Sequence, residues 1–196
     1  MIFIRKATSN DSESITAYLL LAMEDIVCGF IGEQDLQKAR EFLLHFVEKD
    51  NNQYSYQNCW VVEDQNMKVI AAINLYNGAL LSELRQPIVD YVSSKFNKGF
   101  NPEDETQEGE YYIDSIGVNP NQQSKGIGTK VLRFIIDEYV NKLGQPLGLL
   151  VDETNPNAKR LYLKLGFKPA GRKVLFGKNM EHLQIKVEGI SLYQNK

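Results

Sequence analysis

The sequence is poor in cysteine, carries no strong excess of charge and contains no uninterrupted run of 18 apolar residues. Two cysteines, Cys28 and Cys59, occur in 196 residues, which is too few for a disulfide framework, and neither has the spacing of metal ligands. We expect both to be small core residues and expect no metal. A formal net charge of −3 argues against a general nucleic-acid-binding surface.

The first six residues lack the order of a signal peptide, and no apolar run has the length of a membrane span. We therefore expect a reducing cytoplasmic location, with neither a membrane nor a nucleic acid as partner. A homodimer is possible, although no residue pattern requires one.

The length of 196 residues predicts a single domain, residues 1–196, with a substantial core. Apolar alternation and helical spacing predict an α/β fold on one sheet of mixed strand directions, in the order β-α-α-β-β-(insert)-β-α-β-α-β-β. The first helix is expected to end near Cys28, because Gly29 and Gly32 follow. Strands are predicted at residues 2–5, 59–63, 67–73, 111–118, 148–151, 167–176 and 181–187, and helices at residues 11–28, 35–49, 127–140 and 155–165.

Residues 77–109, called the insert below, have the weakest pattern. A short helix is predicted from Glu83 to Phe96, with Pro87 near its first turn, where proline is tolerated. Residues 101–109 hold four carboxylates and few apolar groups, which is typical of a solvated loop. The alternative for this acidic stretch is recruitment of a cationic acceptor.

A glycine loop at residues 123–128, Gln-Ser-Lys-Gly-Ile-Gly, separates the apolar run 111–118 from an amphipathic helix. The free N–H groups and partial positive charge of a helix N-terminus favour a phosphate there. The third glycine of a Rossmann fingerprint is absent, and Gly128-Thr129-Lys130 does not supply a Walker Lys-Ser/Thr, so both nucleotide motifs are disfavoured. A turn without a ligand remains an alternative.

A second block, Asn155-Pro-Asn-Ala-Lys-Arg-Leu-Tyr162 followed by Leu165-Gly-Phe167, lies about 30 residues after the glycine loop. Together the two blocks resemble the GNAT N-acetyltransferase superfamily. The resemblance covers residues 110–187 well and residues 1–76 loosely, and the insert looks like a subfamily feature. It implies a central mixed, mostly antiparallel sheet, splayed at the acyl-CoA site and flanked by helices.

The resemblance further implies direct transfer of an acetyl group from acetyl-CoA to a primary amine of a small molecule or peptide. Gly117 fits either a bulge beside the thioester or a merely packed small residue, and Asn155 fits either a pantetheine contact or a helix N-cap. The residues expected to bind acetyl-CoA are Ile116, Gly117, Val118, Gln123, Ser124, Lys125, Gly126, Ile127, Gly128, Thr129, Asn155 and Tyr162.

For catalysis, the resemblance implies that Tyr162 protonates the leaving thiolate, although a tyrosine packed against the sheet is the alternative. Glu110 and Asp114, four apart on one predicted strand, are the candidates for the general base if they are not simply hydrated. We lean to Glu110, because it stands eight residues before Val118, where the resemblance implies a glutamate base of the kind that protein N-terminal acetyltransferases of this superfamily often carry. The two histidines, His45 and His182, lie outside both blocks and are poor candidates.

The acceptor pocket is expected between the first two helices, around residues 24–30, and the insert. A small-molecule amine is favoured slightly, because the insert could cover a groove for a protein chain. The alternatives are a protein N-terminal or lysine acetyltransferase, a non-catalytic acyl-CoA-binding or regulatory module, and a nucleotide-binding module.

Overall fold

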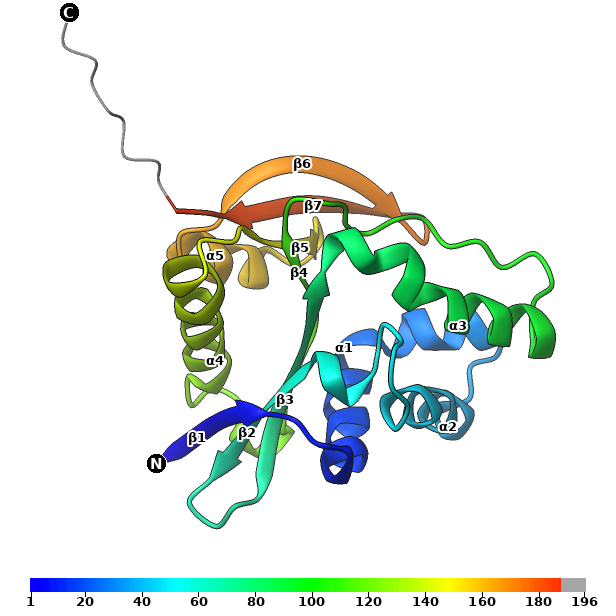
Figure 1. The fold of residues 1–196 in the computed structure, drawn as a ribbon, viewed down its shortest axis with the longest axis horizontal. Coiled ribbons are helices and arrows are strands. Elements are labelled where there is room, and N and C mark those ends of the chain that lie inside the picture. Colours follow the sequence, from blue (N-terminus) through cyan, green and yellow to red (C-terminus); the bar gives the residue numbers. More distant parts are fainter. Residues whose placement is uncertain (188–196) are drawn as a thin grey trace, which may run out of the picture.

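Short apolar strands alternate with amphipathic helices along residues 1–187, the part of the chain that the computed structural model describes (Figure 1). Every predicted strand and helix is present, in the predicted order. The strands are β1 (Ile2–Lys6), β2 (Cys59–Asp64), β3 (Val69–Asn77), β4 (Tyr111–Val118), β5 (Leu147–Asp152), β6 (Lys168–Leu175) and β7 (Lys178–Ile185). The helices are α1 (Ser12–Ile31), α2 (Leu36–Val47), α3 (Leu81–Lys95), α4 (Ile127–Ile136), which a π-helical segment, η5 (Asp137–Lys142), continues, and α5 (Pro156–Lys164).

The seven strands form one sheet in the order β1-β2-β3-β4-β5-β7-β6. All neighbours are antiparallel except β4 and β5, which are parallel. These two strands pair only where Tyr111–Ile113 faces Leu147–Leu149, and the register between them stops there. The sheet is therefore mixed, mostly antiparallel and splayed in the middle, as predicted.

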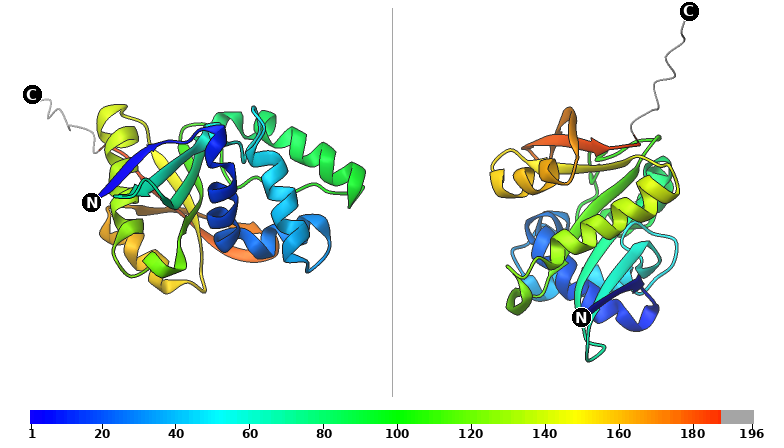
Figure 2. Two further views of the ribbon diagram at one scale, coloured as in Figure 1. Left: turned by 90° about the horizontal axis from the view of Figure 1, so that it is seen from below. Right: turned by 90° about the vertical axis from the view of Figure 1, so that its left-hand side faces the viewer.

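Helices cover both faces of the sheet, and each layer has its own apolar core (Figures 1 and 2). On one face, α1, α2 and α3 bury residues such as Val27, Leu43 and Ile88. On the other face, α4 packs with Leu132 and Ile135 against the sheet, and α5 lies beside it. Both cysteines are buried in the first core, as expected, and burial raises the pKa of Cys59 to about 12.

Helix α1 differs from the prediction, because it runs through Gly29 and ends only at Gly32. Gly32 has φ of 71° and its N–H binds the carbonyl of Cys28, which is a left-handed glycine cap. Gly29 is retained in the helix because Val27, Cys28, Phe30 and Ile31 around it are buried. Tertiary packing thus outweighs the low helix propensity of one glycine.

The same helix bends at Met23, where φ is −129° and ψ is 19°. Together with the short turn before it, the segment Ser9–Ile31 is long and apolar enough to be considered as a membrane span, with a mean hydropathy of 1.6. Half of its most apolar window is buried inside the fold, where α1 packs on β3 and β4. An apolar core helix meets the same criteria.

The insert differs from the prediction in two respects. Helix α3 begins at Leu81, so Pro87 stands in its second turn rather than its first. The acidic stretch is not a fully solvated loop, because Glu105 and Thr106 are buried. It runs so close to the end of β3 that a Cβ on Gly78 would lie 2.1 Å from the carbonyl oxygen of Gln107.

Candidate active site

The glycine loop leads into α4, and its residues 123–126 are exposed. Gly126 is the N-cap of α4 with φ of 74°, and Ser124 has φ of 61°. Ile127 is buried and anchors the helix, whereas Gln123, Ser124 and Lys125 are exposed. The helix start leaves the N–H groups of residues 127–129 without partners inside the helix, so they are free to bind an anion.

The surroundings of Gly128 fit a diphosphate at this loop. A Cβ built on Gly128 would meet no protein atom closer than 4.0 Å, the nearest being a methyl group of Val118. Packing within the protein therefore does not require glycine here, and the space is open for a ligand. Lys125 Nζ binds the Asn121 carbonyl at 3.0 Å beside the loop and adds positive charge.

The splay between β4 and β5 begins after Ile113 and leaves one edge of β4 free. Ile116 and Val118 pair with β3 on their other side, and no register pair within residues 1–187 joins them to β5. Gly117 is not at a bulge: a Cβ there would lie 1.8 Å from the carbonyl oxygen of Tyr18. Of the two interpretations of Gly117, the packed small residue is confirmed, because it lets α1 lie directly on β4.

The bulge falls instead at Asp114. The register passes from the Asn74–Ser115 pair to the Leu75–Ile113 pair and leaves Asp114 unopposed. A bulge re-aims the side chain that it carries. It also interrupts the alternation that would place Glu110 and Asp114 on one face, and within residues 1–187 the two carboxylates share no hydrogen-bond partner.

A cavity of about 520 Å³ lies at the splay and extends under α1 and the insert. It joins the predicted cofactor side to the predicted acceptor side. Four of the sequence-predicted site residues line it: Asp114, Ile116, Asn155 and Tyr162. Ser115 of β4 and Leu150 and Val151 of β5 line it as well.

Tyr162 reaches this cavity from α5. Its ring packs edge-on against Phe167, with 5.9 Å between the ring centroids. The hydroxyl makes no hydrogen bond within residues 1–187, and burial raises the pKa of the phenol. Tyr162 therefore holds its proton at neutral pH. Asn155 also lines the cavity, and its Oδ1 caps α5 by accepting from the N–H of Ala158 at 3.1 Å.

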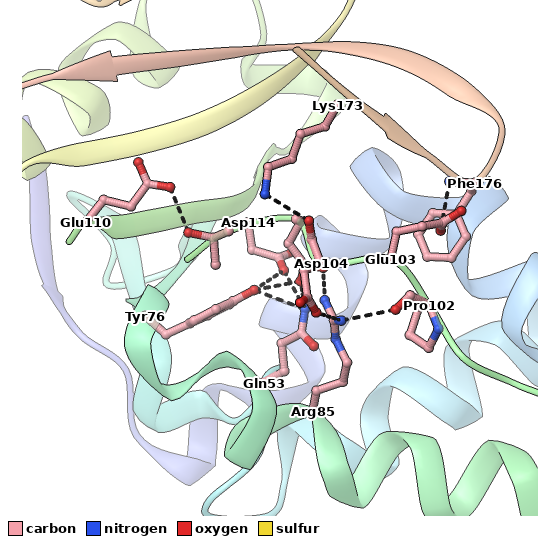
Figure 3. A network of polar contacts seen from close by, with 12 residues as sticks. Gln53, Tyr76, Arg85, Pro102, Glu103, Asp104, Glu110, Asp114, Lys173 and Phe176 are labelled. Atoms are coloured by element: carbon pink, nitrogen blue, oxygen red, sulfur yellow. Dashed lines mark hydrogen bonds and ion pairs between the residues drawn. The ribbon is translucent and has the colours of Figure 1, made fainter. Parts of the chain in front are cut away.

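Asp114 lies in a buried polar cluster that the sequence did not reveal (Figure 3). Its Oδ2 accepts a hydrogen bond from Gln53 Nε2 at 2.9 Å and lies 3.2 Å from the hydroxyl of Tyr76. The same amide and hydroxyl lie 2.5 Å and 2.8 Å from Glu105 Oε1. Burial, and then the negative charge of Glu105, raise the pKa of Asp114 to about 7.

Arg85 holds the acidic part of the insert in this cluster. Its guanidinium forms ion pairs with Glu105 and, at 2.8 Å, with Asp104, and it donates to the carbonyl of Pro102 at 3.3 Å. The cluster thus brings one carboxylate from β4 and one from the insert into the same site. Arg85 itself is almost fully buried.

Glu110 lies apart from this cluster and does not line the cavity (Figure 3). Its carboxylate accepts from Thr106 at 2.7 Å and Gln184 at 3.0 Å and pairs with His182 at 2.9 Å. Burial acts to raise its pKa, but these hydrogen bonds outweigh burial and hold the pKa of Glu110 below its usual value. Gly148 provides the space, because a Cβ there would lie 1.9 Å from the carboxylate.

The histidines lie outside the cavity, in keeping with their poor candidacy. His182 is the partner of Glu110, and His45 on α2 contacts Lys49 at 2.9 Å. Among the described residues, no group of histidine, cysteine, aspartate and glutamate side chains is arranged to hold a metal ion.

Four residues of the site escaped the sequence analysis: Gln53, Tyr76, Arg85 and Glu105. Only Glu105 had a signal, because it belongs to the acidic stretch for which binding of a cationic acceptor was the alternative. The others join the site through contacts 20 or more residues apart in sequence, which no local pattern encodes.

Comparison with known proteins matches residues 20–167 to the acetyltransferase (GNAT) family. A solved acetyltransferase structure matches 95% of this chain and 100% of its own, with 27% identity and a TM-score of 0.75. An N-acetyltransferase from Staphylococcus aureus Mu50 matches 93% of this chain and 100% of its own, at 20% identity and a TM-score of 0.78. Mutant forms of the spermidine/spermine N-acetyltransferase from Vibrio cholerae cover 95% of both chains at 17% identity and a TM-score of 0.56. The last two similarities are of fold alone.

Proposed function

The chain belongs to the acetyltransferase (GNAT) family, and from this premise we propose that it transfers an acetyl group from acetyl-CoA directly to a primary amine of a small molecule. One observation carries the proposal. A single cavity at the splay of β4 and β5 contains a proton-holding phenol, Tyr162, and a carboxylate with a near-neutral pKa, Asp114. An acid for a leaving thiolate and a base for an ammonium are what the transfer requires.

Acetyl-CoA supplies the activated acetyl thioester, and its proposed binding residues are distributed over three elements, α4 with its preceding loop, β4 and α5. The N–H groups of residues 124–129 hold the diphosphate at the start of α4, with Lys125 adding charge. The free edge of β4 at Ile116 and Val118 pairs with the pantetheine arm. The N–H of Val118 polarises the thioester carbonyl, and Asn155 contacts the arm from α5.

Asp114 is the proposed base, in preference to Glu110. Asp114 faces the cavity, whereas the carboxylate of Glu110 is already held by three side chains outside it. A carboxylic acid with a pKa of about 7 is mostly ionised above pH 7, where it can act as a base. Glu110 instead has a structural role, joining β7 to the start of β4.

In the proposed reaction, Asp114 and Tyr162 each transfer one proton. The ammonium gives a proton to Asp114, and the resulting neutral amine attacks the thioester carbonyl carbon. The C–N bond forms, the C–S bond breaks, and the sulfur takes the phenolic proton of Tyr162. The second nitrogen proton restores the phenol in the net reaction, which yields an amide, free CoA and one proton.

The experiment is a screen of primary amines with acetyl-CoA, read by thiol release and by the mass of the acetylated product. We expect thiol release that depends on both enzyme and amine. If acetyl-CoA binds with no amine ever acetylated, the chain is an acyl-CoA-binding module instead. Tighter binding of ATP or NAD than of CoA in calorimetry would favour the nucleotide-binding alternative.

A further inference from the structure

A turn between α2 and β2, residues 52–55, is buried throughout and borders the cavity on the side of the acidic cluster. Asn52 fixes this turn. Its side-chain amide donates to the carbonyls of Phe46 and Lys49 at 2.9 and 3.0 Å, and its Oδ1 accepts from the N–H of Tyr54 at 3.0 Å. The end of α2 therefore holds the backbone of Tyr54 in place.

The hydroxyl of Tyr54 has no hydrogen-bond partner within residues 1–187, although only 2% of the residue is exposed. Burial of a hydroxyl without a partner costs free energy, so such a group calls for an explanation. The fully enclosed side-chain oxygens without a partner in the described part of the chain belong to Thr16, Asn74 and Ser115, and the Tyr54 oxygen is not among them. It therefore keeps contact with open space, and Tyr54 lines the cavity.

Tyr54 lies near both carboxylates of the cluster. Burial, and then the negative charges of Asp114 and Glu105, raise the pKa of Tyr54 well above its usual value. The phenol is therefore neutral at physiological pH, and its oxygen can accept a hydrogen bond. Asp114 also keeps one oxygen available: Gln53 and Tyr76 contact Oδ2, whereas Oδ1 has no partner within residues 1–187 (Figure 3).

A buried ammonium needs several hydrogen-bond acceptors. It carries three N–H donors, and each donor that leaves water without finding a partner costs free energy. Glu105 is already engaged by other side chains of the cluster, Arg85 among them. Asp114 Oδ1 supplies one acceptor in the cavity, and the phenol oxygen of Tyr54 supplies another. Together they match the nitrogen of a primary amine before and after it loses its first proton.

We propose that Tyr54 is a further catalytic residue, whose hydroxyl oxygen accepts a hydrogen bond from the acceptor nitrogen beside Asp114. The inference rests on the proposed acetyltransferase function. The ammonium gives one proton to Asp114, and Tyr54 holds a second N–H while the nitrogen lone pair forms the C–N bond. The phenol of Tyr54 neither gains nor loses a proton, so the proton balance of the reaction is unchanged. Tyr54 thereby orients the lone pair toward the thioester carbon.

Tyr54→Phe removes the hydroxyl and keeps the ring. Because this hydroxyl has no protein partner, we expect the free energy of unfolding to stay the same or to rise. We expect kcat/KM for the amine to fall at least about tenfold, with the Kd of acetyl-CoA unchanged. The rise of kcat with pH should persist, because Asp114 remains the base. The acceptor is the best of four amines: n-hexylamine, 1,6-diaminohexane, 2-phenylethylamine and a short peptide with a free N-terminus.

Tyr139→Phe is the matched control. Tyr139 is also buried, but it lies outside the cavity and its hydroxyl accepts from Trp60 Nε1 at 3.3 Å. We expect this variant to lose stability and to keep the kcat/KM of the parent. Parental kcat/KM in Tyr54→Phe contradicts the inference, and so does a loss of activity that accompanies lower stability and weaker acetyl-CoA binding. If the parent itself acetylates no amine of any class, the proposed function fails and the inference falls with it.

Discussion

At the scale of the residue, burial perturbs two groups of one cavity in complementary ways. Burial raises the pKa of the Tyr162 phenol, and burial with the charge of Glu105 raises the pKa of Asp114 to about 7. The first group can therefore give a proton at neutral pH, and the second can take one. Their separate elements, α5 and β4, hold them on the two sides of the splay.

Replacement of Tyr162 by phenylalanine tests the proton donor. We expect kcat to fall by at least about 30-fold, with the Kd of acetyl-CoA nearly unchanged, because the hydroxyl acts on the departing thiolate. Steady-state rates and calorimetry measure the two quantities. Tyr91→Phe on α3, which does not line the cavity, is the control and should retain full activity. Equal turnover in Tyr162→Phe and the parent would remove this residue from the mechanism.

The pH dependence of kcat tests the proposed base. A raised carboxyl pKa means that the active, ionised form accumulates as pH rises, so kcat at saturating amine should increase up to about pH 7 and then level off. Asp114→Asn should abolish this rise. Glu105→Gln removes the negative charge that raises the pKa of Asp114, so the rise should move to lower pH. Glu108→Gln, an exposed neighbour in the insert, should leave the profile in place.

Glu110 should affect stability rather than the pH profile. Its pKa is held below the usual value, so its ionised form stabilises the fold above the carboxyl pKa of the unfolded chain, and that stability is lost as pH falls through the lower folded value. We expect Glu110→Gln to reduce the free energy of unfolding at pH 7 by about 1–3 kcal/mol. Denaturant unfolding at several pH values measures this. A loss of the alkaline rise in kcat in this variant would return the base role to Glu110.

At the scale of the element, the start of α4 is the proposed diphosphate site, and it can be tested without disturbing the fold. In Gly128→Val the new side chain would occupy space that no protein atom fills within 4.0 Å of the Cβ position. We expect a Kd for acetyl-CoA raised at least about tenfold, with the free energy of unfolding unchanged or slightly higher, since valine is a better helix former than glycine. Arg133→Val, exposed on the same helix, is the control. Normal affinity in Gly128→Val would place the diphosphate elsewhere.

Helices and strands that depend on local sequence patterns were predictable from the sequence. Features that depend on contacts between distant residues were not. The apolar run at residues 111–118 and the helical spacing of apolar residues after Ile127 sufficed for β4 and α4. The path of residues 101–109 depends on Arg85, twenty residues before Glu105, so its charge alone indicated a solvated loop. The bulge at Asp114 is set by pairing with β3 and has no mark in the sequence of β4 itself.

At the scale of the whole molecule, the proposed donor and acceptor sites lie at different parts of the sheet. We propose that the splay of β4 and β5 admits the thioester, and the cavity continues from the splay under α1 and the insert. The insert also contacts the β6–β7 hairpin. On this proposal the family fold positions the acetyl donor, and α1 and the insert border the acceptor.

The most direct test of this account measures amide and free CoA side by side in one reaction of the full chain with acetyl-CoA and the best acceptor of the four amines. The account predicts equal amounts of acetylated amine and free CoA, both lost in a Tyr162→Phe, Asp114→Asn double variant that still binds acetyl-CoA. Free CoA without the amide, or amide formation that survives both substitutions, would contradict it.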